Sequence, residues 1–146
     1  MRDHLANGDT AKINGIIKYL VDDFATSLNQ HNRKGGLIGL AATAIALGSD
    51  CQAYVPQLVP PVLACFADND SKVRYYACES MYNLAKVARG LVLAYFNEIF
   101  DYLSKLAADP DTGVKNASEL LDRLVKVDRQ SKDRPSINVI FYTLFY

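Results

Sequence analysis

Two stretches of this 146-residue chain repeat one another. The segment "DNDSKVRYYACESMYNL" (68–84) aligns without a gap on "DPDTGVKNASELLDRLV" (109–125) at an offset of 41 residues. The aligned pairs are Asp68 and Asp109, Asp70 and Asp111, Val73 and Val114, Arg74 and Lys115, Ala77 and Ser118, and Leu84 and Val125. Toward the N-terminus, an offset of 40 places Arg74 on Lys34. A unit of this length cannot bury its apolar side alone, so the period predicts a stack of similar units.

Each unit contains two helical patterns, in which apolar residues recur three and four positions apart. The predicted helices are 11–28, 34–47, 53–67, 72–88, 91–107 and 113–127. Pro60 and Pro61 should kink or shorten the third of them. Strand-type alternation is absent before residue 136. We therefore predict an all-α fold, a right-handed α-α superhelix of the HEAT or armadillo type. Its helix pairs span 10–48, 51–89 and 91–127 within a domain of residues 1–128, and an aromatic tail follows at 129–146.

The acidic turns, "DNDS" and "DPDT", raise the question of a metal site. A metal site built on D-x-D needs further oxygen ligands or histidines. The two histidines, His4 and His31, are not placed beside these turns. Aspartate before a helix commonly caps its free N–H groups and complements the helix dipole. We therefore predict that Asp70 or its neighbour Ser71 caps the fourth helix and that Asp111 and Thr112 do the same for the sixth, with no metal or cofactor.

The repeated charges suggest a second structural role for the turns. Asp68 and Arg74 recur as Asp109 and Lys115. In a stack, the basic residue of one repeat can bond the turn aspartate of its neighbour. The spacing therefore predicts a ladder of ion pairs between repeats, as HEAT proteins have.

Other patterns argue against catalysis and against charged partners. The chain has 16 basic and 16 acidic residues, so its net charge gives no indication of nucleic acid binding. The segment "KGGLIGL" lacks the Lys-Ser/Thr ending of a phosphate loop, and its glycines should instead admit a close neighbouring helix. Three cysteines without CxxC spacing suit reduced thiols in a cytosolic protein. The longest apolar run, Leu37 to Leu47, is too short to span a membrane.

The fourth helix offers a candidate protein-binding face. Its apolar side carries Val73, Ala77, Ser80, Leu84 and Val87. The opposite side carries Tyr75, Glu79, Tyr82, Lys86 and Arg89. Tyrosine and arginine are enriched at interface hot spots, which favours a protein partner for this side. The alternative is that both tyrosines pack against the flanking repeats.

Three longer strings are more particular than any repeat consensus. They are "RKGGLIGLAATAIALG" (33–48), "RYYACESMYNLAKVARG" (74–90) and "LSKLAADPDTGVKNASELLDRLVK" (103–126). Over about residues 12–127 the chain resembles the N-terminal HEAT region of the Vac-fourteen family of vacuole-morphology scaffolds. The C-terminal "RQSKDRPSINVIFYTLFY" does not resemble the continuation of that family.

The resemblance implies a non-catalytic scaffold that self-associates and works at the cytoplasmic side of endosomal and vacuolar (lysosomal) membranes. Its implied partners are a PIKfyve/Fab-type phosphatidylinositol-3-phosphate 5-kinase and a Sac-domain phosphoinositide phosphatase. Together they would control phosphatidylinositol 3,5-bisphosphate. The alternative from the residues alone is a HEAT module of another class, such as a transport receptor or a regulatory subunit.

Overall fold

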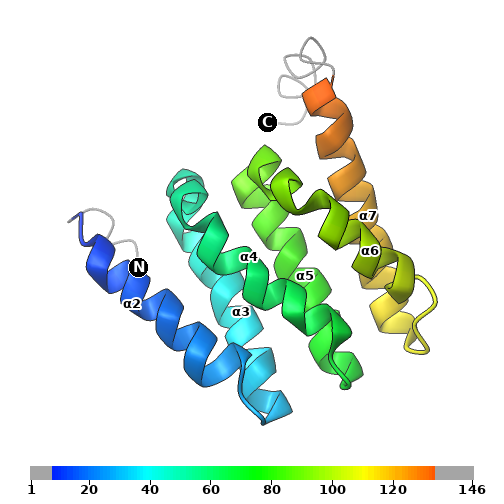
Figure 1. Ribbon diagram of the computed structural model, residues 1–146, viewed down its shortest axis with the longest axis horizontal. Helices are drawn as coiled ribbons and strands as arrows, with labels where there is room; N and C mark the ends of the chain where they lie inside the picture. The colour runs from blue at the N-terminus through cyan, green and yellow to red at the C-terminus, as the bar shows by residue number, and fades with distance from the viewer. Residues whose placement is uncertain (1–7, 134–146) are drawn as a thin grey trace.

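The computed structural model describes residues 8–133 as two layers of helices (Figure 1). The first layer contains α2 (Thr10–Tyr19) with its π-helical extension η1 (Leu20–Ala25), α4 (Val55–Ala64) and α6 (Phe96–Leu106). The second layer, behind it in the figure, contains α3 (Gln30–Leu47), α5 (Ser71–Ala88) and α7 (Thr112–Asp133). Short 3-10 segments lead into or out of the first layer: η2 (Gly48–Tyr54), η3 (Cys65–Ala67) and η4 (Arg89–Tyr95).

The predicted all-α class is confirmed, since residues 8–133 contain helices and no strand. The helices pair in chain order, α2 with α3, α4 with α5 and α6 with α7, as in a solenoid. The right-handed sense of the superhelix and the division at residue 128 stay predictions. The predicted tail, 129–146, lies outside the described residues from 134 onward.

The second-layer helices begin at side-chain caps spaced 41 residues apart. Asn29 Oδ1 accepts from the His31 N–H at 2.8 Å, and Asp70 Oδ1 accepts from the Val73 N–H at 3.0 Å. Asp111 Oδ1 accepts from the Gly113 N–H at 2.8 Å. The predicted start of the second helix at residue 34 is therefore wrong: α3 begins at Gln30. The first turn of α3 is exposed to water and carries polar residues. By its polarity alone this stretch of sequence could not be distinguished from a loop.

Glycine lets η1 lie directly against α3. A Cβ at Gly36 would lie 2.5 Å from the backbone nitrogen of Ala25, closer than any side chain tolerates. A Cβ at Gly39 would lie 2.7 Å from a methyl group of Leu20. The predicted close approach at these glycines is confirmed for Gly36 and Gly39, whereas Gly35 has only an ordinary contact at 3.9 Å.

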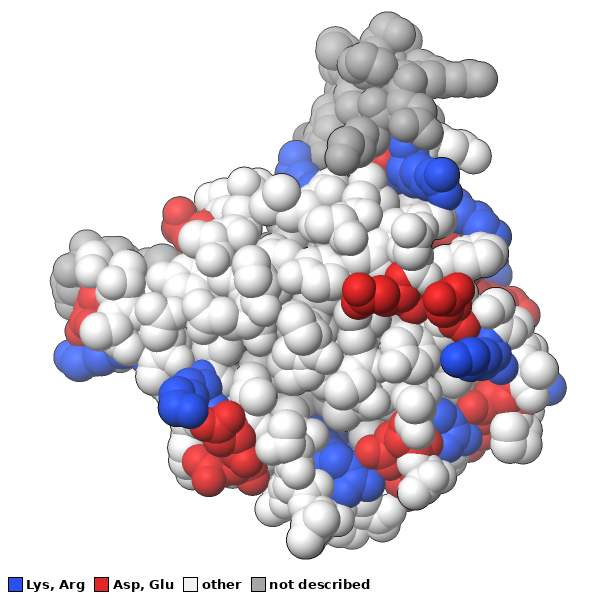
Figure 2. Space-filling model, viewed as in Figure 1, with Lys and Arg blue, Asp and Glu red and all other residues white. Residues whose placement is uncertain are grey.

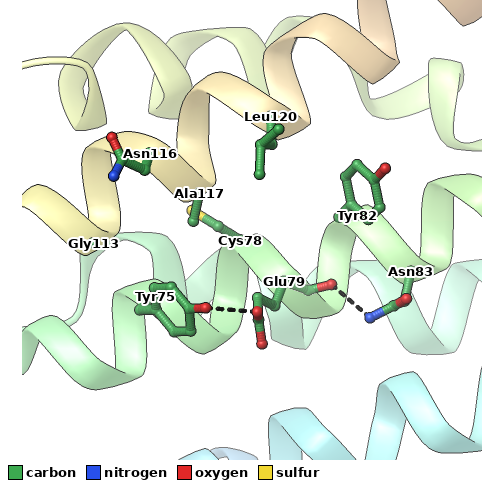
Figure 3. A pocket seen from close by; sticks show the side chains of 9 residues that line it. All are labelled: Tyr75, Cys78, Glu79, Tyr82, Asn83, Gly113, Asn116, Ala117 and Leu120. Carbon is green, nitrogen blue, oxygen red and sulfur yellow. Dashed lines mark hydrogen bonds between the residues drawn. The ribbon is translucent and has the colours of Figure 1, made fainter.

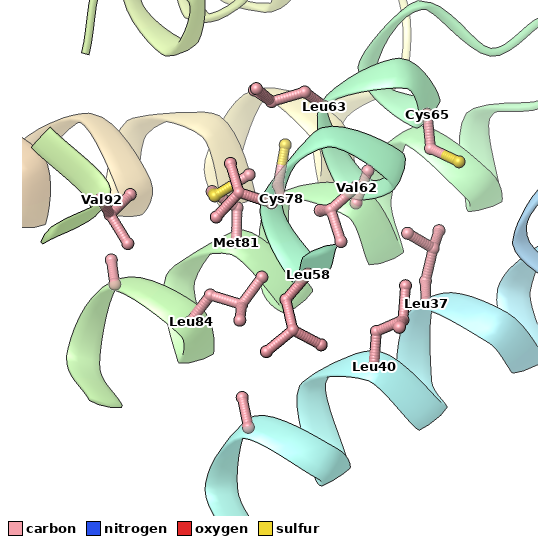
Figure 4. Close-up of a cluster of buried hydrophobic side chains, with 14 of the residues drawn as sticks. Leu37, Leu40, Leu58, Val62, Leu63, Cys65, Cys78, Met81, Leu84 and Val92 are labelled. Atoms are coloured by element: carbon pink, nitrogen blue, oxygen red, sulfur yellow. The ribbon is translucent and has the colours of Figure 1, made fainter. Parts of the chain in front are cut away.

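One continuous hydrophobic core runs between the layers and through all three helix pairs (Figure 4). Its fully buried members include Leu37 and Leu40 from α3, Leu58 from α4, and Met81 and Leu84 from α5. The three cysteines are free and buried in it. Burial raises the pKa of Cys51 and of Cys65 to about 11 and that of Cys78 to about 12, so all three thiols are protonated near neutral pH.

The third predicted helix, 53–67, is divided into η2, α4 and η3. Pro60 and Pro61 lie inside α4 and have no N–H to donate, and the 3-10 segment η3 follows four residues later. The expected shortening is therefore present: the α-helical part ends at Ala64.

The segment Gln30–Ala67 is long and apolar enough, by length and composition, to cross a membrane. This differs from the expectation drawn from the shorter run 37–47. In the structure this segment is not one continuous helix, because α3 ends at Leu47, Gly48 follows with φ 58°, and α4 lies in the other layer. Of the most apolar 18-residue window, 44% is buried inside the fold.

Candidate protein-binding site

The turns between paired helices are joined by ion pairs from one repeat to the next. Arg33 of α3 donates from Nε and Nη2 to the two carboxylate oxygens of Asp68, at 2.7 and 3.0 Å. Its third nitrogen, Nη1, donates to the carbonyl oxygens of Ser27 and Leu28, each at 2.9 Å. One guanidinium therefore holds its own turn and the turn of the following repeat.

Arg74 of α5 makes the same set of contacts 41 residues later. Its Nε and Nη2 donate to Asp109 at 2.7 and 3.0 Å, and its Nη1 donates to the carbonyl oxygens of Asp68 and Asn69. Only 13% of the Arg74 side chain and 6% of the Asp109 side chain are exposed. Figure 2 shows cationic and anionic residues alternating along the lower rim, where these turns lie, while the surface over α4 is uncharged.

Arg33 was missed by the sequence alignment. An offset of 40 placed Lys34 in the position of Arg74, but the contacts show that the offset is 41 in this part of the chain too. Carrying the first offset unchanged toward the N-terminus would have found Arg33.

The turn aspartates also bind their own backbone. Asp109 Oδ1 accepts from the Asp111 N–H at 2.9 Å, and Asp68 Oδ1 accepts from the Asp70 N–H at 2.9 Å. The hydrogen bond from Arg74, assisted by that N–H, holds the pKa of Asp109 below its ordinary value against the opposing effect of burial. The pKa of Asp111 is lowered too, chiefly by the Val114 N–H. Within residues 8–133 no group of three or more His, Cys, Asp or Glu residues is placed to hold a metal ion.

Lys115 holds the third ladder position of the predicted series. Its positive charge contributes to the low pKa of Asp109, but no ion pair joins the Lys115 side chain to another described residue. The ladder in the described residues therefore consists of the Arg33–Asp68 and Arg74–Asp109 pairs.

A groove of about 620 Å³ lies between α5 and α7 (Figure 3). Tyr75, Glu79 and Tyr82 line it from α5, and Leu120 lines it from α7 with 54% of its surface exposed. The Tyr75 hydroxyl donates to Glu79 Oε1 at 2.7 Å, which orients that carboxylate. The remaining lining residues are Cys78, Asn83, Gly113, Asn116 and Ala117.

The five residues proposed for binding do not all meet at this groove. Tyr75, Glu79 and Tyr82 line it, and the Lys86 ammonium lies 5.7 Å from the centre of the Tyr82 ring beside it. Both tyrosines are half-buried against the core, so they both line the groove and pack within the stack. Arg89 does not line the groove; it is the C-cap residue of α5, with φ 52°. Burial raises the pKa of Asp128 in α7, and the positive charge of Arg89 opposes that rise.

Exposed apolar residues lie on α3 and α7, the two helices that flank α5. At the offset of 41, Glu79 corresponds to Ile38 and Leu120, and Lys86 corresponds to Ile45 and Val127. These four hydrophobic residues are 50–54% exposed and are half of the eight large hydrophobic residues exposed in the described part of the chain. We call this surface, with its tyrosine-lined groove, the α3–α5–α7 face. The contributions of α3 and α7 were not predicted, because the pattern of one helix does not show which residues of its neighbours lie beside it.

Comparison with known proteins identifies relatives over most of the chain. Residues 31–127 match the family model described as the Vacuolar 14 Fab1-binding region. The chain is 51% identical to the Protein VAC14 homolog of Arabidopsis thaliana over 132 residues, and 54% identical to that of Schizosaccharomyces pombe over 128 residues. It is 55% identical over 121 residues to the Vacuole morphology and inheritance protein 14 of Saccharomyces cerevisiae.

These matches cover 82–90% of this chain but only 14–18% of each relative. No solved structure matches the chain. The family model includes both ladder arginines and all of the α5–α7 groove. On the strength of this coverage and identity, the chain belongs to the Vac14 family.

Proposed function

We propose that this chain is a non-catalytic docking module for a PIKfyve/Fab-type lipid kinase, and that the α3–α5–α7 face is its contact surface. The matched region of the family, residues 31–127, is described as Fab1-binding, and it includes all of α5 and most of α3 and α7. The kinase class follows from that description and from the resemblance of the sequence to the Vac14 scaffolds.

The observation that carries this proposal is the composition of the α3–α5–α7 face. Ile38 and Ile45 of α3, and Leu120 and Val127 of α7, expose apolar surface at matching positions on the two helices that flank α5. Tyrosines at the centre provide large, rigid side chains of the kind that dominates interface energies. The ladder of ion pairs fixes the helices relative to one another, so the face is preorganised and loses little entropy on binding.

The wider role of the family extends the proposal. The module would contribute to a scaffold that also holds a Sac-domain phosphatase and controls phosphatidylinositol 3,5-bisphosphate at vacuolar and endosomal membranes. It would reach those membranes from the cytoplasm through its partners, and self-association would belong to the longer family members. The proposal involves no cofactor, and it assigns a structural role to the turn aspartates, which bond Arg33, Arg74 and backbone N–H groups.

The test is co-precipitation of the full chain with a PIKfyve/Fab-type kinase and, separately, with a Sac-domain phosphatase. The variant Leu120→Asp places a charge on the α3–α5–α7 face at an exposed position, so the fold should survive. We expect kinase binding to fall at least about tenfold, as loss of a hot-spot contact does. The matched control is Phe100→Asp, an equally apolar residue, 46% exposed, on α6 in the other layer.

Equal loss of binding in the two variants would reject the α3–α5–α7 face. A folded wild-type chain that binds neither enzyme would reject the docking function and favour a HEAT module of another class.

A further inference from the structure

Among the described residues that line the groove between α5 and α7, Glu79 alone carries a charge. We infer that Glu79 and the neighbouring Tyr75 bind an arginine side chain of the protein partner. The inference deepens the proposed function and rests on it for the identity of that partner, a PIKfyve/Fab-type lipid kinase. It adds the chemistry that the partner must present, which is one arginine among apolar side chains.

The Glu79 carboxylate is oriented by a tyrosine that is itself fixed. The Tyr75 hydroxyl donates to Glu79 Oε1 at 2.7 Å, and this hydrogen bond raises the pKa of Tyr75, so the hydroxyl remains a donor at neutral pH. The Tyr75 ring packs edge-on against Tyr76, with ring centres 5.4 Å apart. It also lies against α7, where a Cβ at Gly113 would be 3.7 Å from the ring. The carboxylate is therefore preorganised by contacts from two helices.

The oriented carboxylate is still able to bind a cation. The hydrogen bond from Tyr75 uses one of its two oxygens, whereas an ionised carboxylate offers about four acceptor positions. Glu79 is exposed, and no ion pair joins it to another residue in the described range 8–133. Lys86, two turns further along α5, lies over the Tyr82 ring instead, 5.7 Å from its centre. The groove thus presents a carboxylate that no described cation neutralises.

Arginine fits this arrangement better than lysine. A guanidinium group donates two parallel N–H groups to a carboxylate, and its flat face packs on aromatic rings. Tyr75 and Tyr82 line the groove about one helical turn before and after Glu79 (Figure 3). A side chain that reaches Glu79 therefore passes beside a tyrosine ring, and a cation gains from contact with such a ring.

The neighbouring helices indicate that the arginine belongs to a protein. At the offset of 41, Glu79 corresponds to Ile38 of α3 and Leu120 of α7, which are 50% and 54% exposed. A free cation would leave this apolar surface in water, whereas a protein segment with apolar side chains beside its arginine would cover it. Apolar contacts are not directional, so the carboxylate would fix the register of that segment. An acidic residue in the place of the arginine would be repelled.

NMR titration of the isotope-labelled full chain with two peptides tests the site directly. The probe is acetyl-Leu-Arg-Leu-amide. The matched control has citrulline in place of arginine, which keeps the length and the planar end of the side chain but removes the charge. We expect the amide shifts of Tyr75, Glu79 and Tyr82 to saturate at a concentration at least about fivefold lower with the arginine peptide. Equal affinities for the two peptides would overturn the inference.

Three variants show whether the preference for arginine depends on this site. Glu79→Gln removes the charge at nearly constant shape and should abolish the preference. Tyr75→Phe keeps the ring but removes the hydroxyl that orients Glu79, so it should weaken the preference. Glu98→Gln is the matched control, because it neutralises an exposed carboxylate on α6 in the other layer, and it should behave as the wild type. An unchanged preference in Glu79→Gln would overturn the inference.

Co-precipitation with the lipid kinase separates this inference from the proposed function. We expect Glu79→Gln to weaken kinase binding at least about fivefold, with Glu98→Gln again as the control. A wild-type chain that binds the arginine peptide but no kinase would reject the proposed function and support the arginine site. Kinase binding that Glu79→Gln leaves unchanged would overturn the inference while the docking function stands. If Glu79→Gln then also lowered the mass of the chain by light scattering, the groove would be assigned to a second copy of the chain.

Discussion

At the scale of single residues, the contacts of Arg74 place the strictest requirement on side-chain geometry. We call this arrangement, in which two guanidinium nitrogens bond a carboxylate and the third bonds two carbonyl oxygens, the arginine fork. Arg74 must supply three nitrogens in one plane to reach the Asp109 carboxylate and two carbonyl oxygens at once. Guanidinium does this and ammonium does not. The Arg74 side chain is largely buried, so a hydrogen bond that it loses cannot be replaced by one to water.

Arg74→Lys should therefore destabilise the fold although it keeps the charge. We expect the free energy of unfolding, measured in urea, to fall by about 2 kcal/mol, as when hydrogen bonds to a buried charge are lost. Lys115→Ala is the matched control, since it removes a basic side chain from the same repeat position without breaking an ion pair. Its effect should stay within about 0.5 kcal/mol. Equal effects of the two changes would contradict the role of the fork.

The same pair predicts a dependence on pH. Arg74 lowers the folded-state pKa of Asp109 below its ordinary value of 3.8. The stabilisation is therefore complete above that value and is lost as the pH falls through the folded-state pKa. Asp109→Asn should be less stable than the wild type at pH 6, and the difference should shrink below pH 3.8. Urea denaturation across this range checks it, and a difference that grows on acidification would contradict it.

At the scale of helices, close packing of η1 on α3 depends on the missing side chain of Gly36. The backbone of Ala25 occupies the place of its Cβ, and backbone cannot move aside as a flexible side chain can. Leu20 at Gly39 is different, because the end of its side chain can rotate.

Gly36→Ala should therefore destabilise the fold by about 1–3 kcal/mol, the usual cost of forcing extra volume into a packed site. Gly15→Ala is the control, since nothing lies within 4 Å of its Cβ and alanine favours a helix by about 0.5–1 kcal/mol. The two thermal midpoints should move in opposite directions. A Gly36→Ala midpoint at or above that of the wild type would show that η1 can move away from α3.

The sequence was informative about helices and less so about contacts between them. Helical periodicity and the acidic turns predicted six helices close to their observed positions, because both signals are local. The first turn of α3 was misplaced because exposed helix and loop are equally polar. Leu120 was missed because the groove joins residues 41 positions apart, and only stacking brings them together. The ion pair of Arg33 with Asp68 was missed because the predicted alignment of the first repeat was wrong by one residue.

At the scale of the whole molecule, each repeat is stabilised by its contacts with the repeat beside it. α5 packs against both α3 and α7, so it couples the two ends of the stack. α7 has a neighbour in the second layer on one side only within the described residues, and its other side is charged. In such an array, damage at an end should unfold locally while damage at the centre should affect every repeat.

Hydrogen exchange on two cavity variants would measure this coupling. Leu84→Ala in α5 and Leu121→Ala in α7 each remove a fully buried leucine side chain, at a typical cost of about 2–5 kcal/mol. We expect Leu84→Ala to speed amide exchange in α3, α5 and α7 together, because each end then loses its packed neighbour. Leu121→Ala should speed exchange in α6 and α7 while α3 stays protected. Equal acceleration in α3 by both variants would mean that the three repeats unfold as one unit, and that the α3–α5–α7 face is held together by the whole stack rather than by successive pairs.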